Sequence, residues 1–115
     1  PYPAGGINFA PVQDVAAGHV LAAALGVAGQ SYILGHRDGN LTERAFLNLV
    51  SEAAGRAAIA PAGAQGALAD ALTANPERAI RELGLPQSDL RAAFRDAVAW
   101  FQAGVERSRV AEARV

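Results

Sequence analysis

The stretch INFAPVQDVAAGHVLAAA, from Ile7 to Ala24, decides how the rest of the chain has to fold. It predicts a short extended segment over Ile7 to Val12, in which Pro11 allows only an edge strand or a strand end. Asp14 is a predicted N-cap for a helix that runs to about Leu25. Apolar residues lie nearly all the way round this helix, so we expect it to be buried on more than one side. Neighbouring elements therefore have to supply that cover.

The composition is that of a globular chain and excludes several kinds of chemistry. The 115 residues are 51% hydrophobic and 18% charged, with a formal net charge of -1, so no basic surface for nucleic acid or an anionic membrane is expected. Every basic residue besides histidine is Arg, which excludes lysine-dependent chemistry within these residues. Cysteine is absent, which excludes thiolate and Cys-zinc sites and fits a reducing cytoplasm. Richness in Ala, Arg and Gly is typical of a GC-rich, bacterial genome.

Strand and helix signals alternate in the next part of the chain. Ser31 to Leu34 is predicted to be a short strand, followed by a turn over residues 35–40 with Asp38-Gly39 as its strongest signal. Thr42 is predicted to cap a helix over residues 43–54. Gly55 is expected to end that helix.

The remaining segments are predicted to be mostly helical. Ile59 is the possible start of a strand, and Gln65 to Leu72 is predicted to be helical. Asn75-Pro76 begins a short helix that Gly84 ends. Ser88 is predicted to cap the last helix, whose polar end from Glu106 either frays or extends into solvent. The apolar face of this helix consists of Leu90, Phe94, Ala97, Val98 and Phe101.

These elements contain too few strands for the helices they accompany. Alternating strands and helices are typical of parallel α/β architecture, in which crossover helices cover a sheet. Two or three short strands are marginal as an independent sheet. We therefore expect the helix from Asp14 to Leu25 to need cover that this chain does not fully contain. The cover comes from a longer parent polypeptide or from another chain, unless the helices have repacked as a bundle.

Four stretches, taken together, resemble the C-terminal portion of the extended short-chain dehydrogenase/reductase family, the NAD(P)-dependent epimerases and dehydratases. Among the members of this family, the dihydroflavonol-reductase-like enzymes have the most similar residue pattern. The stretches, in the family's order, are NFAPVQDVAAGHVLAA (Asn8 to Ala23), QSYILGHRDGNLTERAFLNLVSEAAGR (Gln30 to Arg56), NPERAIRELGL (Asn75 to Leu85) and LRAAFRDAVAWFQ (Leu90 to Gln102).

The resemblance implies an α/β fold: a partial Rossmann-type parallel sheet with a helix-rich C-terminal substrate-binding region, mostly α by residue count. Residues 1–115 would form one partial domain without the dinucleotide-binding half. The family's glycine fingerprint and its catalytic Tyr-x-x-x-Lys are absent, since Tyr2 and Tyr32 have no Lys partner. These residues are therefore not expected to transfer hydride by themselves.

The function implied is the substrate-binding portion of an NAD(P)-dependent oxidoreductase or epimerase that acts on a hydroxyl or carbonyl of a sugar-like or small carbonyl substrate. NAD or NADP would belong to the parent enzyme, and none is expected to bind this chain alone. By resemblance, Asn8 and Phe9 are the predicted substrate-binding residues, and no catalytic, cofactor-binding or metal-binding residue is predicted. The expected partners are a small-molecule substrate and the remainder of the Rossmann domain or another chain, with a homo-oligomer left open. A pyrophosphate-bearing substrate is disfavoured, because no Arg lies between Ala60 and Ala67.

Structural roles explain the other notable side chains. His19 is predicted to be a packed, hydrogen-bonded histidine, and His36 to lie in a solvated turn with Arg37 and Asp38. No carboxylate stands at metal-ligand spacing from either histidine. Trp100 and Phe101 are expected to pack as apolar side chains. The alternative function is a catalytically inactive helical module for protein interaction or self-association, whose interface would be the apolar faces of the first and last helices.

Overall fold

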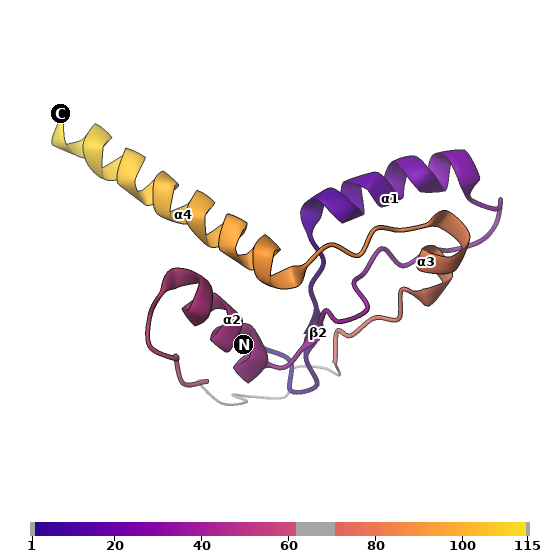
Figure 1. The fold of residues 1–115 in the computed structure, drawn as a ribbon, viewed down its shortest axis with the longest axis horizontal. Helices are drawn as coiled ribbons and strands as arrows, with labels where there is room; N and C mark the ends of the chain where they lie inside the picture. The colour runs from indigo at the N-terminus through magenta and orange to yellow at the C-terminus, as the bar shows by residue number, and fades with distance from the viewer. Residues whose placement is uncertain (1, 62–70, 115) are drawn as a thin grey trace.

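The computed structural model describes residues 2–61 and 71–114, and more than half of these are helical (Figure 1). The elements in order are β1 (Ile7–Asn8), α1 (Val12–Leu25), β2 (Asn40–Leu41), α2 (Glu43–Ala54), α3 (Glu77–Leu83) and α4 (Leu90–Ala113). Strands β1 and β2 pair antiparallel, with Ile7 opposite Leu41 and Asn8 opposite Asn40. Ile7 also makes an isolated parallel bridge to Leu72. The fold is therefore mixed α/β and mostly helical.

The sheet differs from the one predicted. Ser31 to Leu34 is not a strand, and the strand lies beyond the turn at Asn40–Leu41. The turn brings Asn40 back beside Asn8, so the pairing is antiparallel. A partial Rossmann sheet is not seen in the described residues. Ile59 begins no strand. Of the helix predicted over residues 65–72, positions 65–70 lie outside the described residues.

Several helix ends lie where local sequence predicted them. The Thr42 hydroxyl accepts from the Ala45 N–H at 3.2 Å and caps α2. Gly55 and Gly84 end α2 and α3 in the left-handed region, with φ of 65° and 69°. The polar end of α4 continues as helix to Ala113. These signals are local, because each cap satisfies backbone groups within its own helical turn.

Two predicted caps are wrong, and they bind each other. Helix α1 begins at Val12, so Asp14 lies in its first turn, and α4 is capped by Asp89, which accepts from the Ala92 N–H at 3.0 Å. The buried Asp14 carboxylate instead accepts from the Ser88 N–H at 2.8 Å and from the Ser88 hydroxyl at 2.6 Å. This Asp14–Ser88 pair ties the start of α1 to the residue just before the α4 cap.

The buried apolar core is small and lies between α1 and α3. Its buried members are Ala79, Leu83 and Leu85, against which Leu21, Ala22, Tyr32, Leu34 and Ile80 pack. Gly18 allows α1 to approach closely, because a Cβ there would come within 2.8 Å of the Leu34 and Leu85 side chains.

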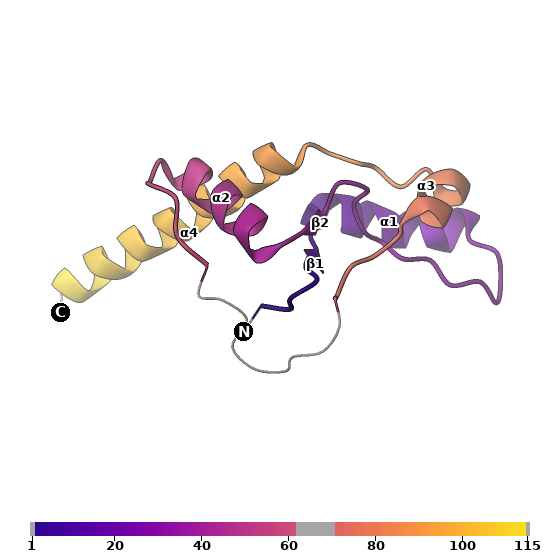
Figure 2. The same ribbon diagram turned by 90° about the horizontal axis from the view of Figure 1, so that it is seen from below.

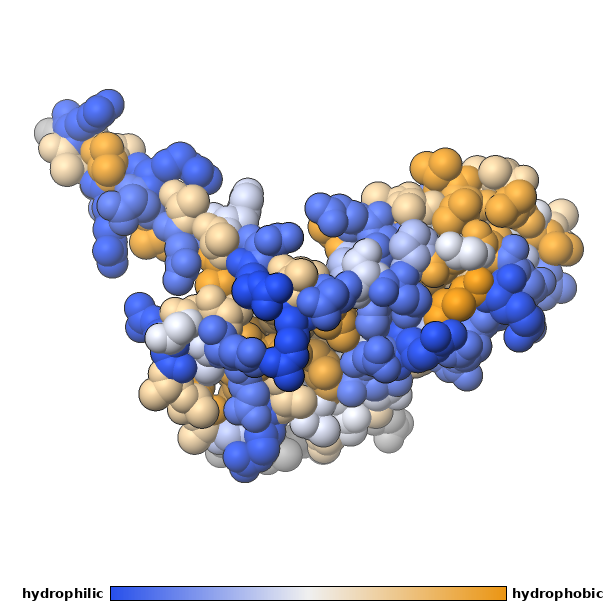
Figure 3. Space-filling view, viewed as in Figure 1, coloured by the Kyte–Doolittle hydropathy of each residue, from blue (hydrophilic) through white to orange (hydrophobic). Residues whose placement is uncertain are grey.

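Helix α1 is buried on one side only, although we expected cover on more than one. On its other side Val12 is 79% exposed and Val20 is 70% exposed. Within residues 2–61 and 71–114 no sheet lies over this face, and the space-filling view shows hydrophobic residues gathered over the α1 arm (Figure 3). In the described residues, the two-stranded sheet therefore leaves this face of α1 exposed.

An aromatic cluster holds together the part of the molecule that consists of β1, β2, α2 and the start of α4. The Phe9 ring, just after β1, stacks on Phe46 of α2 at a centroid distance of 4.9 Å. Phe94 of α4 contacts both rings, and Tyr2 stacks on the far side of Phe46. The Tyr2 hydroxyl donates to the Leu41 carbonyl at 2.6 Å, and burial raises the pKa of this phenol above its ordinary value. The cluster therefore joins β1, β2, α2 and α4.

The molecule is open rather than compact. Helices α1 and α4 diverge from a common region, and α4 projects away from the body in both views (Figures 1 and 2). The radius of gyration is 17.2 Å, whereas a compact domain of this length has about 13 Å. The accessible surface is 7806 Å², against about 5,900 Å² for a folded monomer of this mass. In the described part of the chain, no helix combines the length and hydrophobicity needed to cross a membrane.

Replacing Gly39 should reveal the tight contact between the turn and β1. A Cβ at Gly39 would collide with the Phe9 carbonyl oxygen, and backbone cannot move aside as a side chain can. We expect Gly39→Ala to lower the free energy of unfolding by more than about 2 kcal/mol in urea titrations. Gly29→Ala is the matched control, since its φ is 82° but nothing lies within 4 Å, and it should cost about 1 kcal/mol. Equal losses in the two variants would contradict the packing described here.

Candidate ligand groove

A groove of about 600 Å³ lies where α1 and α4 diverge. One wall is the segment that enters α1, and the other is the face of α4 that turns toward it; the notch between the two arms is visible in Figure 3. The volume lies in the range of small-molecule sites. The lining residues are Phe9, Ala10, Pro11, Val12, Gln13, Leu90, Ala93, Phe94, Asp96, Ala97, Trp100 and Phe101.

The position of the groove follows from the Asp14–Ser88 pair. Asp14 follows Gln13 directly, and Ser88 lies two residues before Leu90, so the two hydrogen bonds fix both walls at their origin. The stacking of Phe9 on Phe46, together with the contact of Phe94 with both rings, closes the floor. The groove is therefore held by contacts between segments far apart in the sequence.

The groove is strongly apolar and carries one charge. Among the described residues of its lining, Asp96 is the only charged side chain, and the Gln13 amide and the Trp100 indole N–H are the other polar groups. Trp100 and Phe101 form an edge-to-face pair with centroids 5.0 Å apart, and they remain 65% and 66% exposed. The expectation that these two rings pack as buried apolar side chains is therefore wrong for the described residues, in which they contact each other and stay mostly exposed.

The two predicted substrate-binding residues have different surroundings. Phe9 lines the groove, where one face of its ring is occupied by Phe46. Asn8 lies behind it, and both N–H groups of its amide are used: one donates to the His36 carbonyl at 2.9 Å and the other to Asn40 Oδ1 at 2.8 Å. Its Oδ1 accepts from the His36 N–H at 3.0 Å. Substrate contact by Asn8 and Phe9 stays a prediction.

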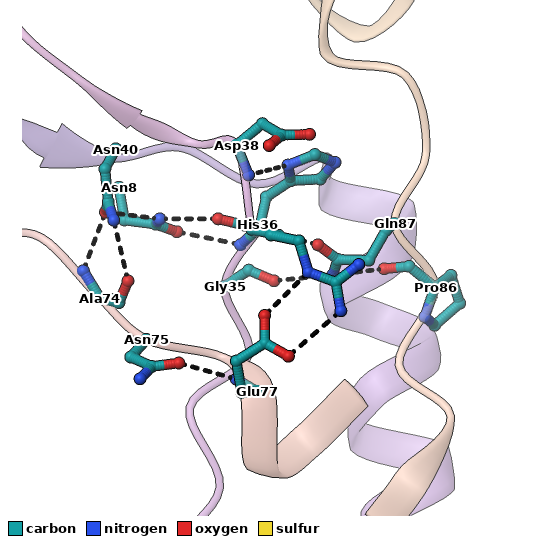
Figure 4. A network of polar contacts seen from close by, with 11 residues as sticks. Asn8, Gly35, His36, Asp38, Asn40, Ala74, Asn75, Glu77, Pro86 and Gln87 are labelled. Atoms are coloured by element: carbon teal, nitrogen blue, oxygen red, sulfur yellow. Dashed lines mark hydrogen bonds and ion pairs between the residues drawn. The ribbon is translucent and has the colours of Figure 1, made fainter. Parts of the chain in front are cut away.

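The side chains of Asn8 and Asn40 bind backbone groups of neighbouring segments that are not strands (Figure 4). The Asn40 amide donates to the Ala74 carbonyl at 3.0 Å and accepts from the Ala74 N–H at 2.9 Å. The two side chains therefore satisfy backbone groups of the turn and of the segment before α3. Gly35 is required beside them, because a Cβ there would come within 2.7 Å of Asn8 Oδ1.

His36 is buried, not solvated as predicted. Its Nδ1 accepts from the Asp38 N–H at 3.0 Å, so Nε2 carries the proton and donates to the Ser88 carbonyl at 2.8 Å. The ring is therefore a structural link from the turn to the segment before α4. His19 is hydrogen-bonded as predicted, through Nδ1 to the Val15 carbonyl at 2.8 Å, but it is exposed rather than packed. No cluster of metal-ligating side chains occurs in the described residues.

An exposed ion pair links the turn over residues 35–40 to the start of α3 (Figure 4). Arg37 donates to Glu77 through Nε at 2.8 Å and through Nη2 at 3.1 Å. The hydrogen bond and charge of Arg37 hold the pKa of the Glu77 carboxyl below 4.5. Gln87 adds a link from the other side by accepting from the Arg37 N–H at 2.6 Å and donating to the Gly35 carbonyl at 3.1 Å.

Sequence reasoning did not identify Gln13 and Asp96 as groove residues or Asn40 as the partner of Asn8. Asp96 precedes Trp100 by four residues, a spacing that places both side chains on one side of a helix. That spacing was available in the sequence as a signal. The role of Asn40 depends on the turn returning to Asn8, which no local pattern encodes.

Comparison with known proteins gives one informative match. A protein of Synechocystis sp. (strain ATCC 27184 / PCC 6803 / Kazusa), named "Putative dihydroflavonol 4-reductase", is 33% identical over 129 residues, a match that covers 84% of this chain and 37% of the relative. This chain is thus similar to part of a reductase-like protein and spans well under half of its length. No family model matches the chain, and no solved structure matches it.

Removing the Asn8 amide tests its structural role. Asn8→Ala deletes three hydrogen bonds and leaves the His36 N–H without its partner, so we expect a loss of about 2–4 kcal/mol in the free energy of unfolding. Urea denaturation followed by circular dichroism measures this loss. Gln30→Ala is the control, since it removes one exposed hydrogen bond from Arg78 and should cost less than about 1 kcal/mol. Unchanged stability of Asn8→Ala would leave substrate contact as its role.

The Arg37–Glu77 pair gives a pH-dependent prediction. Because the pKa of Glu77 is lowered in the folded state, the pair stabilises the fold above pH 4.5, and this stabilisation is lost as the pH falls through the lowered value. Carboxyl-carbon NMR titration should find the pKa of Glu77 below its ordinary value in the unmodified chain and higher in Arg37→Gln. Arg81→Gln should shift it less, because Arg81 acts only through its charge at longer range. Identical pKa values in all three proteins would show that the pair does not form in solution.

Proposed function

We propose that this chain is the substrate-side, C-terminal portion of an NAD(P)-dependent reductase or epimerase of the extended short-chain dehydrogenase/reductase family. The observation that carries this proposal is the 33% identity to part of a protein named as a dihydroflavonol reductase. The chain would supply the shape of the substrate pocket and the positioning of the substrate, a hydroxyl- or carbonyl-bearing molecule. The parent would act in the cytoplasm.

The described residues do not fit the dinucleotide itself. A pyrophosphate needs positive charge or the open N–H groups of a glycine-rich helix start, whereas the groove lining contains Asp96 and no basic residue. The first turn of α1 contains the buried Asp14, which accepts from Ser88 and adds negative charge at this helix start. In this proposal NAD or NADP therefore binds the other part of the parent.

Exposed apolar surface supports the view that this chain works as a part of something larger. Its accessible area exceeds the value expected for a folded monomer by about 1,900 Å², which is more than one partner contributes to a standard interface, about 800 Å². Part of the exposed apolar side-chain surface belongs to α1, on which Val12, Val20 and Leu25 are 57–79% exposed. In the proposed parent, a Rossmann-type sheet would cover this helix. We propose that this outer face of α1 docks on the remainder of the Rossmann domain or on another chain.

A second candidate function is a helical interaction or self-association module. The observation that favours it is the projecting half of α4, on which Trp100, Phe101, Val105 and Val110 are 45–66% exposed. This candidate requires no cofactor. It differs from the first in predicting that the chain's own gene encodes no dinucleotide-binding half.

The decisive experiment uses the complete product of the gene that encodes this chain. Its intact mass should exceed 11.8 kDa, and it should consume NADPH or NADH, followed by absorbance, when supplied with a dihydroflavonol or a related carbonyl substrate. The chain of residues 1–115 alone is the control and should show no cofactor binding. An 11.8 kDa product that self-associates and ignores both cofactors would favour the interaction module. Tight NAD(P)H binding by residues 1–115 alone would overturn both proposals.

A further inference from the structure

We propose that Asp96 is a specificity-determining residue that makes the groove accept a ring-bearing ligand with a hydrogen-bond donor and reject anionic ligands. The inference rests on the proposed function, because it names the chemical class of substrate that the groove would take. Such a ligand places its ring among the aromatic side chains and its hydroxyl or ammonium group against the Asp96 carboxylate. Phosphorylated or carboxylated ligands would bind more weakly than neutral or cationic ones of the same shape.

The charge distribution around the groove is the first argument. The chain contains ten arginines, yet none lines the groove. Arg91, on the same helix, is engaged with Glu52 of α2 at 2.7 Å and lies outside the lining. Arg95 adjoins Asp96 in sequence but does not line the groove either. An anion in the groove would therefore meet a carboxylate and no compensating cation.

The aromatic walls are the second argument. Phe9, Phe94, Trp100 and Phe101 all contribute to the lining. The face of an aromatic ring is the negative part of its quadrupole, so a stacked ligand ring or a cation is attracted to it and an anion is not. A groove of about 600 Å³ holds one or two fused or linked rings comfortably. The aromatic walls and the Asp96 carboxylate therefore both favour a neutral or cationic ring-bearing ligand over an anion.

Asp96 lies close enough to the aromatic walls to contact the same ligand that they bind. Asp96 lies one helical turn before Trp100, so its carboxylate and the indole border the same part of the groove. No ion pair of Asp96 occurs among the described residues, and its oxygens are available to a ligand donor. Because Asp96 is exposed at the rim, water screens its charge and the expected discrimination is modest, about fivefold.

The single tryptophan of the chain provides the readout. Trp100 gives one indole N–H signal in a proton–nitrogen correlation spectrum, and Trp100→Phe identifies it. The probes share one skeleton and differ in charge: phenylpropanol, phenylpropylamine and phenylpropanoate. We expect the alcohol and the amine to shift the indole signal saturably, and the propanoate to bind about fivefold or more weakly.

The matched variants separate a local effect from a net-charge effect. Asp96→Asn should remove the discrimination against phenylpropanoate, whereas Glu106→Gln should retain it. A second groove lies farther along α4 and is lined by residues from Trp100 to Glu112. Glu106 lies on the same helix but borders neither groove. Equal changes in both variants, or propanoate binding as tight as that of the alcohol in the unmodified chain, would overturn the inference. Absence of any saturable shift with all three probes would overturn the groove as a ligand site.

The result is independent of the proposed catalytic role. Binding is measured without cofactor or turnover, so the complete gene product can prove to be a reductase while the inference about Asp96 fails, and the reverse. If residues 1–115 give the indole shift of an unfolded chain, the same titration on the complete gene product decides, with Trp100→Phe again assigning the signal.

Discussion

The hydrogen bonds between Asp14 and Ser88 are the constraint on which the rest of the molecule depends. They join residues 74 positions apart and bring the start of α1 to the segment that enters α4. On one side of this joint lies the small core between α1 and α3, and on the other lies the aromatic cluster of β1, α2 and α4. No second apolar layer connects these two halves in the described residues, so a polar contact sets their geometry. The groove lies beside the joint because both of its walls begin there.

The parts of the fold that sequence predicted well are those decided within one helical turn. Thr42, Gly55 and Gly84 satisfy helix ends through backbone groups close to them in the chain. Asp14 and Ser88 have equally good capping chemistry, yet each is used for the other. The predicted strand Ser31 to Leu34 is wrong, because no strand of the described residues pairs with it. Just beyond it, the Asn8 side chain binds both backbone groups of His36. Local propensity takes no account of a hydrogen-bonding partner that lies 28 or 74 residues away in the sequence.

The candidate site was only partly predictable for the same reason. Phe9 was identified through a family resemblance and does line the groove, but its neighbours Gln13 and Asp96 are polar residues on helices that were read for their apolar faces. A polar residue at the edge of an apolar stripe usually faces solvent, and here the angle between two helices places it in the lining of a groove. His36 shows the converse, because a histidine in a glycine-rich turn became buried once the Ser88 carbonyl lay within reach of its Nε2.

The exposed apolar residues place a bound on how this chain can be stable. Each large side chain left in water forgoes about 1.5–3 kcal/mol of burial, and on α1 and its C-terminal extension Val12, Val20, Leu25 and Val27 are all more than half exposed. Together these amount to several kcal/mol, comparable with the whole stability of a typical domain, about 5–15 kcal/mol. The match to the cyanobacterial relative runs over 129 residues while this chain has 115, so the relative contains residues in the matched region that have no counterpart here. The proposed docking of α1 on another part of the parent or on another chain would bury this surface and recover that free energy.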